Sequence, residues 1–370
     1  MPVPLLDLKA QHKNIRDEVV AAMMDVVDAQ LFILGESVAK LEEDVAALSR
    51  TKHAIGCASG TDALLLAMKA LDIGRGDEVI TTPFTFFATA GTIHNVGARP
   101  VFVDIEPKTF NIDPARAKTA VTKKTKAVIP VDLFGQMAAI ECIRDMMPDV
   151  PIIEDAAQSI GATRKIGGKV RMAGEAATIG TFSFFPSKNL GGYGDGGMIV
   201  TQDDAIAQRL KQLRVHGGLK TYYHDEVGFN SRLDALQAAV LRAKLKHLDG
   251  WSAKRRENAA YYNEALAGVD GVVTPFIEPN NVSIFNQYTI RAERRDELQA
   301  FLNSKKIGNS IYYPLPLHLQ PCFKYLGYKE GQCPESERAA KEVLSLPVFP
   351  ELTRSQLDEV VDAVRTFYKR

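Results

Sequence analysis

The sequence predicts an α/β fold with a mainly parallel sheet, followed by a smaller α+β domain. This prediction rests on short β-branched runs, on helical patterns between most of them, and on a change of texture near residue 248. Near-continuous apolar runs bounded by Gly, Pro and Asp are typical of parallel strands that helices cover on both faces. We therefore expect a large domain over 1–248 and a small C-terminal domain over 249–370.

In the large domain, helical and strand patterns alternate from about residue 37. Apolar residues at the spacing of one helical face predict a helix over 37–50. A short apolar run, HAIGCAS, precedes a helical pattern in TDALLLAMKAL. Further apolar runs are expected to be buried strands: DEVITTP, ARPVFVDI, KAVIPVDLF, VPIIEDAA and MIVT.

The small domain begins after a long helical pattern over roughly 233–267. A strand-like segment, NQYTIRAE, follows, and then a helical pattern over 295–305. A proline-rich loop, YYPLPLHLQP, and a terminal helix over 353–369 complete the expected α+β arrangement.

Composition excludes several classes of protein. The 370 residues carry 45 Lys+Arg against 45 Asp+Glu, so no basic excess predicts nucleic-acid binding. No run approaches the roughly 18 apolar residues of a membrane span, and the polar start does not fit a signal peptide. The four cysteines lack CxxC spacing, which argues against structural zinc, a metal centre or a disulfide framework. We expect a cytoplasmic protein with reduced thiols.

Lys188 lies in the most informative segment, SFFPSKNLGGYGDGG. A partly desolvated lysine has a lowered pKa, and its neutral amine can form a Schiff base with an aldehyde or ketone. Glycines beyond it would let the backbone pass close to a flat ligand. The alternative is a solvated turn lysine followed by a loop.

Asp155 ends an apolar strand in PIIEDAAQSIGA, at the edge where α/β sheets bind ligands. A carboxylate there could hold a pyridinium nitrogen protonated, which makes a pyridoxal ring an electron sink. Gln158 follows one helical turn later and could face the same space. The alternative is that Glu154 and Asp155 merely cap the next helix.

Small residues in ASGTDAL stand at a strand-to-helix turn, where free N–H groups and the helix dipole favour an anion. Ser59, Gly60 and Thr61 could bind a phosphate there; the alternative is that Thr61 or Asp62 is a simple N-cap with no ligand. Phe84, Phe86 and Phe87 are more typical of a core, although one of them could cover a ring face. Phosphate anchor, strand-end acid and amine, in this order, predict a pyridoxal phosphate (PLP) site.

The sequence resembles the DegT/DnrJ/EryC1/StrS family of sugar aminotransferases, a branch of the fold-type I PLP enzymes, across essentially its whole length. The motifs that carry the resemblance are LGESVAKLEEDVA, ASGTDAL, GDEVITTPFTFFATA, IEDAAQSIGA, FSFFPSKNLGGYGDGG, FNSRLDALQAAVL and YYPLPLHLQP. The resemblance implies the fold type I architecture with PLP as cofactor. It also implies a homodimer whose subunits share two active sites.

The resemblance assigns expected roles residue by residue. Lys188 matches the catalytic lysine that binds the cofactor and moves the proton, and Asp155 matches the acid on the pyridine nitrogen. A lysine at position 188 favours transamination, because relatives that remove a sugar hydroxyl carry histidine there. The remaining expected cofactor contacts are Gly60, Thr61, Phe86, Gln158, Ser183 and, donated by the neighbouring subunit, Asn230.

The implied reaction moves an amino group from L-glutamate to a nucleotide-linked ketosugar for cell-surface polysaccharide or lipopolysaccharide synthesis. Several motifs resemble enzymes that aminate C3 of UDP-2-acetamido-3-oxo-glucuronate, which have histidine where this chain has Tyr312. Arg232 matches an arginine of that subgroup, and a guanidinium suits a sugar carboxylate; alternatively it pairs with Asp234 or Glu226. Tyr312, Tyr313 and His318 are the other expected substrate contacts, although a lone loop histidine such as His318 is more often a surface residue. The open alternatives are a dTDP-linked 3-oxo- or 4-oxo-6-deoxyhexose and a non-catalytic PLP-fold regulatory protein.

Overall fold

The computed structural model describes residues 2–218, 220 and 222–369. Its central sheet has the strand order β3-β2-β4-β5-β8-β9-β1, because parallel bridges Val128–Ile152 and Val131–Asp155 join β4 to β5. Among these strands only β9 runs antiparallel to its neighbours, so the prediction of a mainly parallel sheet is confirmed. The strands are β1 (His53–Cys57), β2 (Glu78–Thr81), β3 (Arg99–Phe102), β4 (Thr125–Ile129), β5 (Ile153–Asp155), β8 (Ile179–Ser183) and β9 (Gly197–Thr201).

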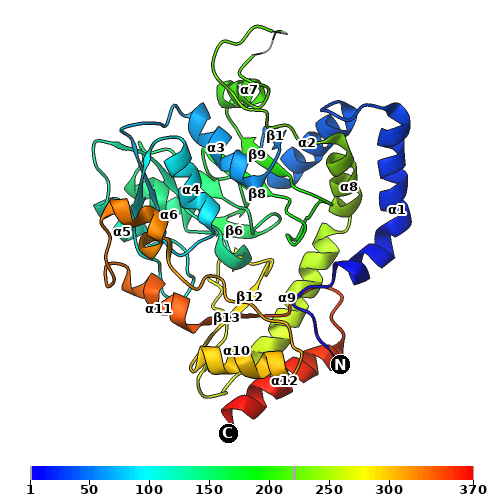
Figure 1. Cartoon of the computed structure of the whole chain (residues 1–370), viewed down its shortest axis with the longest axis vertical. Coiled ribbons are helices and arrows are strands. Elements are labelled where there is room, and N and C mark those ends of the chain that lie inside the picture. The colour runs from blue at the N-terminus through cyan, green and yellow to red at the C-terminus, as the bar shows by residue number, and fades with distance from the viewer. Residues whose placement is uncertain (1, 219, 221, 370) are drawn as a thin grey trace.

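Helices cover the sheet on both faces, as near-continuous apolar strands require (Figure 1). One group packs with Ile55, Val79, Ile153 and Ile199 in a core that includes α3 and α7. On the other face Phe182, Met198 and Val200 meet α2 and α8. The helices up to α8 are α1 (Leu8–Ala29), α2 (Glu36–Ser49), α3 (Gly60–Ala70), α4 (Phe87–Asn95), α5 (Pro114–Thr119), η1 (Leu133–Gly135), α6 (Ile140–Met146), α7 (Asp204–Leu213) and α8 (Ala235–Leu245).

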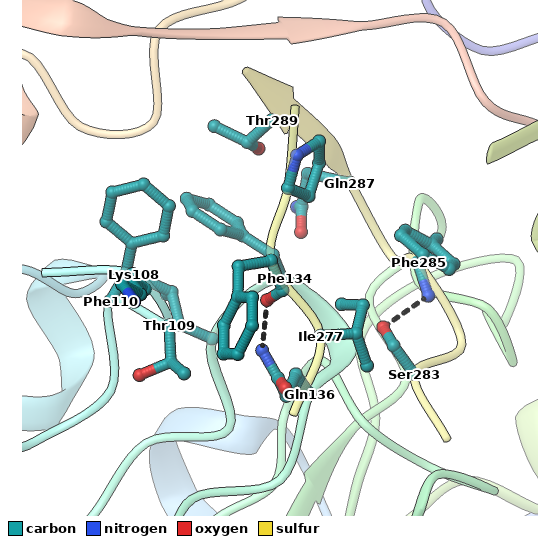
Figure 2. Close-up of a pocket in the computed structure, with 13 residues that line it drawn as sticks. Lys108, Thr109, Phe110, Phe134, Gln136, Ile277, Ser283, Phe285, Gln287 and Thr289 are labelled. Carbon is teal, nitrogen blue, oxygen red and sulfur yellow. Dashed lines mark hydrogen bonds between the residues drawn. The ribbon is translucent and has the colours of Figure 1, made fainter. Parts of the chain in front are cut away.

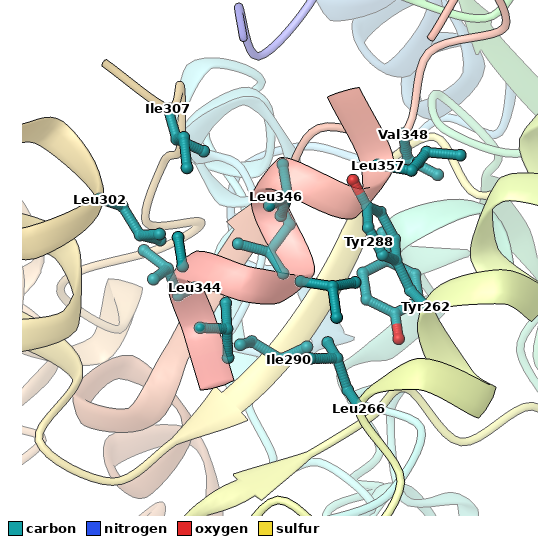
Figure 3. Close-up of a cluster of buried hydrophobic side chains, with 14 of the residues drawn as sticks. Tyr262, Leu266, Tyr288, Ile290, Leu302, Ile307, Leu344, Leu346, Val348 and Leu357 are labelled. Carbon is teal, nitrogen blue, oxygen red and sulfur yellow. The ribbon is translucent and has the colours of Figure 1, made fainter. Parts of the chain in front are cut away.

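The C-terminal part (residues 249–370) has its own small antiparallel sheet, β10-β12-β13. Figure 3 shows its core, where Tyr262 of α9, Tyr288 of β12 and Leu346 of β13 pack beneath α12. Its elements are α9 (Leu248–Ala265), β10 (Val272–Val273), β11 (Asn281–Val282), β12 (Tyr288–Ala292), α10 (Arg295–Ser304), η2 (Leu317–Leu319), η3 (Pro321–Leu326), α11 (Pro334–Glu342), β13 (Val343–Leu346) and α12 (Arg354–Tyr368).

The long helical pattern over 233–267 is two helices, α8 and α9, and the prediction of one helix is wrong. The chain breaks at Lys246 and His247 because the two helices serve different cores: α8 packs with α1 and α2, whereas α9 packs with α12. The β6 (Thr163–Ile166) and β7 (Lys169–Met172) hairpin was not predicted; β11 joins its edge.

Val3 belongs to the C-terminal core although it stands at the start of the chain. Its backbone pairs with Ile307 in a parallel bridge, and its side chain is fully buried among Tyr262, Leu344 and their neighbours. The division at 248/249 remains a prediction. Within the described part of the chain, no helix is both long and apolar enough to cross a bilayer.

Candidate active site

The expected site residues come together at one edge of the central sheet. Asp155 ends β5, Lys188 follows β8, Gly60 begins the helix after β1, and Phe86 precedes α4 beyond β2. Those four strands run in the same direction, so their carboxyl ends share one edge. This is where open α/β sheets bind ligands.

Asp155 is a buried carboxyl group held by two donors. Thr89 Oγ1 donates to its Oδ2 at 2.8 Å, and the Ala157 backbone N–H donates to its Oδ1 at 3.3 Å. Burial raises the pKa of Asp155, whereas these donors and the nearby Lys188 lower it. A buried carboxylate gains most from a cationic partner, which a protonated ring nitrogen would supply.

Gln158 is fixed by hydrogen bonds on both sides of its amide. The Phe134 backbone N–H donates to its Oε1 at 2.7 Å, and its Nε2 donates to the Tyr313 hydroxyl at 3.2 Å. Gln158 is buried and lies in the turn that follows Asp155 at the end of β5. The alternative in which Glu154 and Asp155 only cap a helix fails, because the described residues between β5 and β6 form a turn and no α-helix.

Tyr313 brings the C-terminal part of the chain into this site. Its ring lies 6.3 Å from those of Phe84 and Phe86, measured between centroids. Burial strongly raises the pKa of its hydroxyl, and the charge of Asp155 raises it further. Phe84 is fully buried, whereas Phe86 is 57% exposed, so Phe86 is the phenylalanine of this pair that is open to a ligand.

Lys188 is a half-buried lysine whose ammonium has no partner among the described side chains and backbone groups. Burial lowers its pKa to about 8, and the negative charge of Asp155 opposes that shift. A lysine amine with this pKa is partly neutral near physiological pH, as Schiff-base chemistry requires. The alternative of a fully solvated turn lysine does not fit this position.

A glycine contact shapes the predicted phosphate site. A Cβ atom on Gly60 would lie 2.6 Å from Ser183 Cβ, and one on Gly197 would collide with the backbone of Ser59. These glycines let β8 and β9 approach the first turn of α3 closely. The N–H groups of Gly60 and Thr61 have no acceptor in the described chain, and Thr61 is exposed. An anion therefore fits this turn.

The loop that carries Asn230 and Arg232 is attached to the same turn. Ser231 Oγ donates to Asp62 Oδ2 at 2.6 Å and accepts from the Ala58 N–H at 3.3 Å. Asn230 is exposed, and Arg232 is half-buried with no ion pair among the described residues. The alternative pairing of Arg232 with Glu226 does not form, because Glu226 binds Arg209 instead at 2.9 Å.

His318 is in a different environment from the one expected. Its ring is buried, and its Nε2 lies 3.0 Å from Glu337 Oε1, a carboxylate that also accepts the Gly331 N–H. A buried imidazole with this partner cannot reach a substrate carboxylate. The expectation of a substrate contact from His318 is not supported, and neither is an ordinary surface position.

Two sets of contacts escaped the sequence reasoning. Thr89 holds Asp155, and only its place two residues after the PFTFF aromatics hinted at the site. Asn189, next to Lys188, accepts a hydrogen bond from Asn286 at 2.8 Å and donates to the Ile284 carbonyl at 3.1 Å. Arg255 of α9 in turn donates to the Phe285 and Asn286 carbonyls.

A small cavity lies beside the site (Figure 2). Phe110 and Phe134 line one side of it, and residues of the segment 275–289, which leads into β12, line the other. Its volume is about 20 Å³, enough for one water. Gln136 Nε2 donates across it to the Phe276 carbonyl at 3.1 Å. It is too small for a sugar, so the open edge of the sheet is the candidate active site.

PLP fits this edge by the chemistry of the residues present. An acid, a low-pKa amine and unpaired N–H groups behind a glycine contact match its ring nitrogen, its aldehyde and its phosphate. Fold and site together define a PLP-dependent transferase of fold type I. The chain belongs to the DegT/DnrJ/EryC1/StrS aminotransferase family, whose sequence model matches residues 13–365.

Of three similar proteins, two are named as nucleotide-sugar aminotransferases and one as a regulatory protein. The chain is 55% identical to a pleiotropic regulatory protein of Geobacillus stearothermophilus, over 100% of this chain and 99% of the relative. It is 44% identical to a UDP-N-acetyl-3-dehydro-α-D-glucosamine 3-aminotransferase of Acidithiobacillus ferrooxidans (98% and 97%). It is 43% identical to the UDP-2-acetamido-2-deoxy-3-oxo-D-glucuronate aminotransferase of Pseudomonas aeruginosa (98% and 99%).

Among solved structures, S. venezuelae DesV in complex with a ketimine intermediate superposes with a TM-score of 0.96 at 41% identity, over 100% and 99% of the two chains. The prediction of a PLP-dependent nucleotide-sugar aminotransferase is thereby confirmed, and PLP is the cofactor.

Proposed function

We propose that this aminotransferase transfers the amino group of L-glutamate to C3 of a UDP-linked 2-acetamido-3-oxo sugar, such as UDP-2-acetamido-3-oxo-glucuronate. The observation that carries the assignment of roles is the convergence of Asp155, Gln158, Lys188 and the Gly60 turn on one sheet edge. The substrate class is supported by relatives at 44% and 43% identity that bear such names.

The residues that would hold PLP are those of the sheet edge. Asp155 would face the ring nitrogen, Gln158 the ring hydroxyl and Phe86 the ring face. The Gly60–Thr61 N–H groups and Ser183 would bind the phosphate. When bound, PLP supplies an aldehyde for amine exchange and an electron sink for the carbanion.

Lys188 would carry the proton between substrate carbon and cofactor. Its Nζ, with a pKa of about 8, exists in both protonation states near neutral pH. It can therefore act first as a base and then as an acid. Asp155 and Gln158 are buried and Tyr313 is half-buried, so these residues would keep bulk water from the edge of a bound ring.

Arg232 supports a substrate with a sugar acid. Its guanidinium has no ion-pair partner in the described chain, and it projects from the loop attached to the phosphate turn. A carboxylate at C6 would provide two oxygens for the guanidinium. Tyr312 would contribute a hydroxyl where the subgroup has an imidazole.

We further propose a homodimer in which Asn230 serves the site of the second subunit, since Asn230 is exposed at the rim of its own phosphate turn. Mixing Lys188→Ala subunits with Asn230→Ala subunits tests this role. About a quarter of wild-type activity should return, because half of randomly mixed dimers are hybrids with one intact site. No recovery above the two parents would contradict the shared site.

The experiment that tests the substrate is a screen. L-Glutamate first converts the enzyme to its aminated cofactor form. This form is then given UDP- and dTDP-linked 3-oxo and 4-oxo sugars that carry carboxylate, hydroxymethyl or methyl at C6. We expect the amino product from the UDP-linked 3-oxo members, with Arg232→Met losing the carboxylate preference. A product from dTDP-linked members alone would overturn the proposal.

The non-catalytic regulatory alternative predicts PLP binding without any half-reaction. Lys188, Asp155 and Gln158 are all present, which does not fit loss of catalysis. Release of 2-oxoglutarate from L-glutamate by the wild type, and its absence in Lys188→Ala, would separate the two functions. We place the enzyme in the cytoplasm and its product in polysaccharide synthesis; its four free thiols fit that setting.

A further inference from the structure

Behind Asp155 lies a second pair of carboxyl groups, Asp132 and Glu154, which the reaction does not use. Asp132 follows β4 and Glu154 is the middle residue of β5, and both side chains are completely buried. Within the described chain neither carboxyl group has an ion-pair partner within 4 Å, and the charge of Arg144 acts on Glu154 only without direct contact. Two ionised carboxylates in contact without a cation would be strongly unfavourable there.

The hydrogen bonds show which group needs a proton. Asp132 Oδ1 accepts from the Ala138 N–H at 2.8 Å and its Oδ2 from Ser159 Oγ at 2.7 Å. Glu154 Oε2 accepts from the Gly174 N–H at 3.0 Å, but its buried Oε1 has no donor. The Asp132 and Glu154 carboxyl groups lie close enough together for each to shift the pKa of the other. A proton on Glu154 Oε1, donated to Asp132, satisfies every one of these atoms.

The Asp132–Glu154 pair also holds the turn over residues 155–158, which carries the expected cofactor contacts. Glu154 directly precedes Asp155, and Ser159, which binds Asp132, directly follows Gln158. The Asp132 N–H donates to the Asp155 carbonyl at 3.0 Å, and the Asp155 N–H donates to Pro130. Residues 155–158 are thus fixed at both ends by this pair and its backbone.

We propose that Asp132 and Glu154 share one proton, which Glu154 carries, and that the pair positions Asp155 and Gln158 for the cofactor. This rests on the proposed function for the roles of Asp155 and Gln158. A shared proton leaves one negative charge behind Asp155 instead of two. It therefore keeps Asp155 able to ionise when a cationic ring nitrogen is its partner. Burial and mutual repulsion, which raise the pKa of Glu154 well above its usual range, agree with this reading.

The test compares Glu154→Gln with Asp132→Asn. A glutamine amide donates to Asp132 and accepts from Gly174 just as a protonated Glu154 would. The melting temperature should therefore match that of wild type, and PLP affinity should stay within twofold of it. In Asp132→Asn one accepting oxygen becomes an NH2 group, so either the Ser159 hydroxyl or the Ala138 N–H loses its acceptor, and PLP affinity should fall at least tenfold. Asp104→Asn is the control, because Asp104 is also a buried carboxylate with several donors but lies at the α11 N-terminus.

Infrared spectroscopy of the cofactor-free protein at pH 7 gives a direct readout. The wild type should show the carbonyl band of a protonated carboxylic acid, and Glu154→Gln should lack it. This band does not depend on PLP, so it stands even if the roles of Asp155 and Gln158 fail. Absence of the band in wild type, or equal damage by Glu154→Gln and Asp132→Asn, would overturn the shared proton. PLP affinity left unchanged by Asp132→Asn would overturn the positioning role.

Discussion

Gln158 and Tyr313, 155 residues apart in sequence, are joined by a 3.2 Å hydrogen bond that crosses from the strand-end turn to the proline-rich loop. The bond fixes the amide that we assign to the cofactor ring. It also brings a residue of the C-terminal part into contact with Phe84 and Phe86. Tyr313 thereby joins the C-terminal part of the chain to the candidate active site.

Tyr313→Phe should weaken PLP binding several-fold, because Gln158 Nε2 then loses its acceptor inside the protein. The loss of one hydrogen bond corresponds to about 1 kcal/mol. Fluorescence titration of the cofactor-free protein with PLP measures the effect. Tyr312→Phe is the matched control, since the Tyr312 hydroxyl has no hydrogen-bond partner among the described residues. Equal affinities for the two variants would contradict this role.

Thr89→Val should move the acid limit of PLP binding to higher pH. Thr89 donates to Asp155 and lowers its pKa, so its removal lets Asp155 take up a proton at a higher pH as the pH falls. PLP affinity measured as a function of pH checks the direction. In Thr92→Val, a hydroxyl that binds only backbone carbonyls of its own helix is lost, and the profile should not move.

The Lys188 amine should titrate near pH 8 in the cofactor-free protein, well below the value of about 10.4 for an exposed lysine. Acylation rates followed by mass spectrometry over a pH series report this pKa. Above about pH 8 the unfolded chain binds the proton more tightly than the folded one. Wild type should therefore gain stability relative to Lys188→Met as the pH rises from 8 toward 10.4. A titration midpoint near 10 would refute the partly desolvated amine.

Asn286→Ala should raise the pKa of Lys188 toward its ordinary value. Asn286 holds Asn189, the residue after the lysine, and Arg255 holds the Asn286 carbonyl, so loosening this chain admits water. Asn258→Ala serves as control: Asn258 lies one turn further along α9 and binds the Phe349 carbonyl at 3.0 Å, away from Lys188. Both variants should lose stability, but the acylation profile should shift only in Asn286→Ala.

The strands and the sheet edge were predictable because local patterns define them. A continuous apolar run that ends in Asp155 indicates both a buried strand and a strand-end acid. The β6–β7 hairpin was also within reach, since Gly167 and Gly168 between two alternating runs are typical of a two-residue turn with positive φ. The sequence pattern that indicates this hairpin is therefore present.

Other features depend on contacts that no local pattern encodes. The break between α8 and α9 contains neither Gly nor Pro. It follows from the packing of the two helices into different hydrophobic cores. His318 reads as a loop histidine until Glu337, 19 residues later, is placed against it. Thr89 becomes important only when β5 brings Asp155 beside α4.

Val3 ties the beginning of the chain to the C-terminal core, while α1 returns to pack on α8. The chain therefore passes twice between the C-terminal core and the core that α1 shares with α8, near residues 4–8 and 245–248. Two crossings restrict rotation of one core relative to the other more than a single linker would. A fragment that begins at residue 249 would lack the Val3 side chain, which is buried in the C-terminal core of the intact chain.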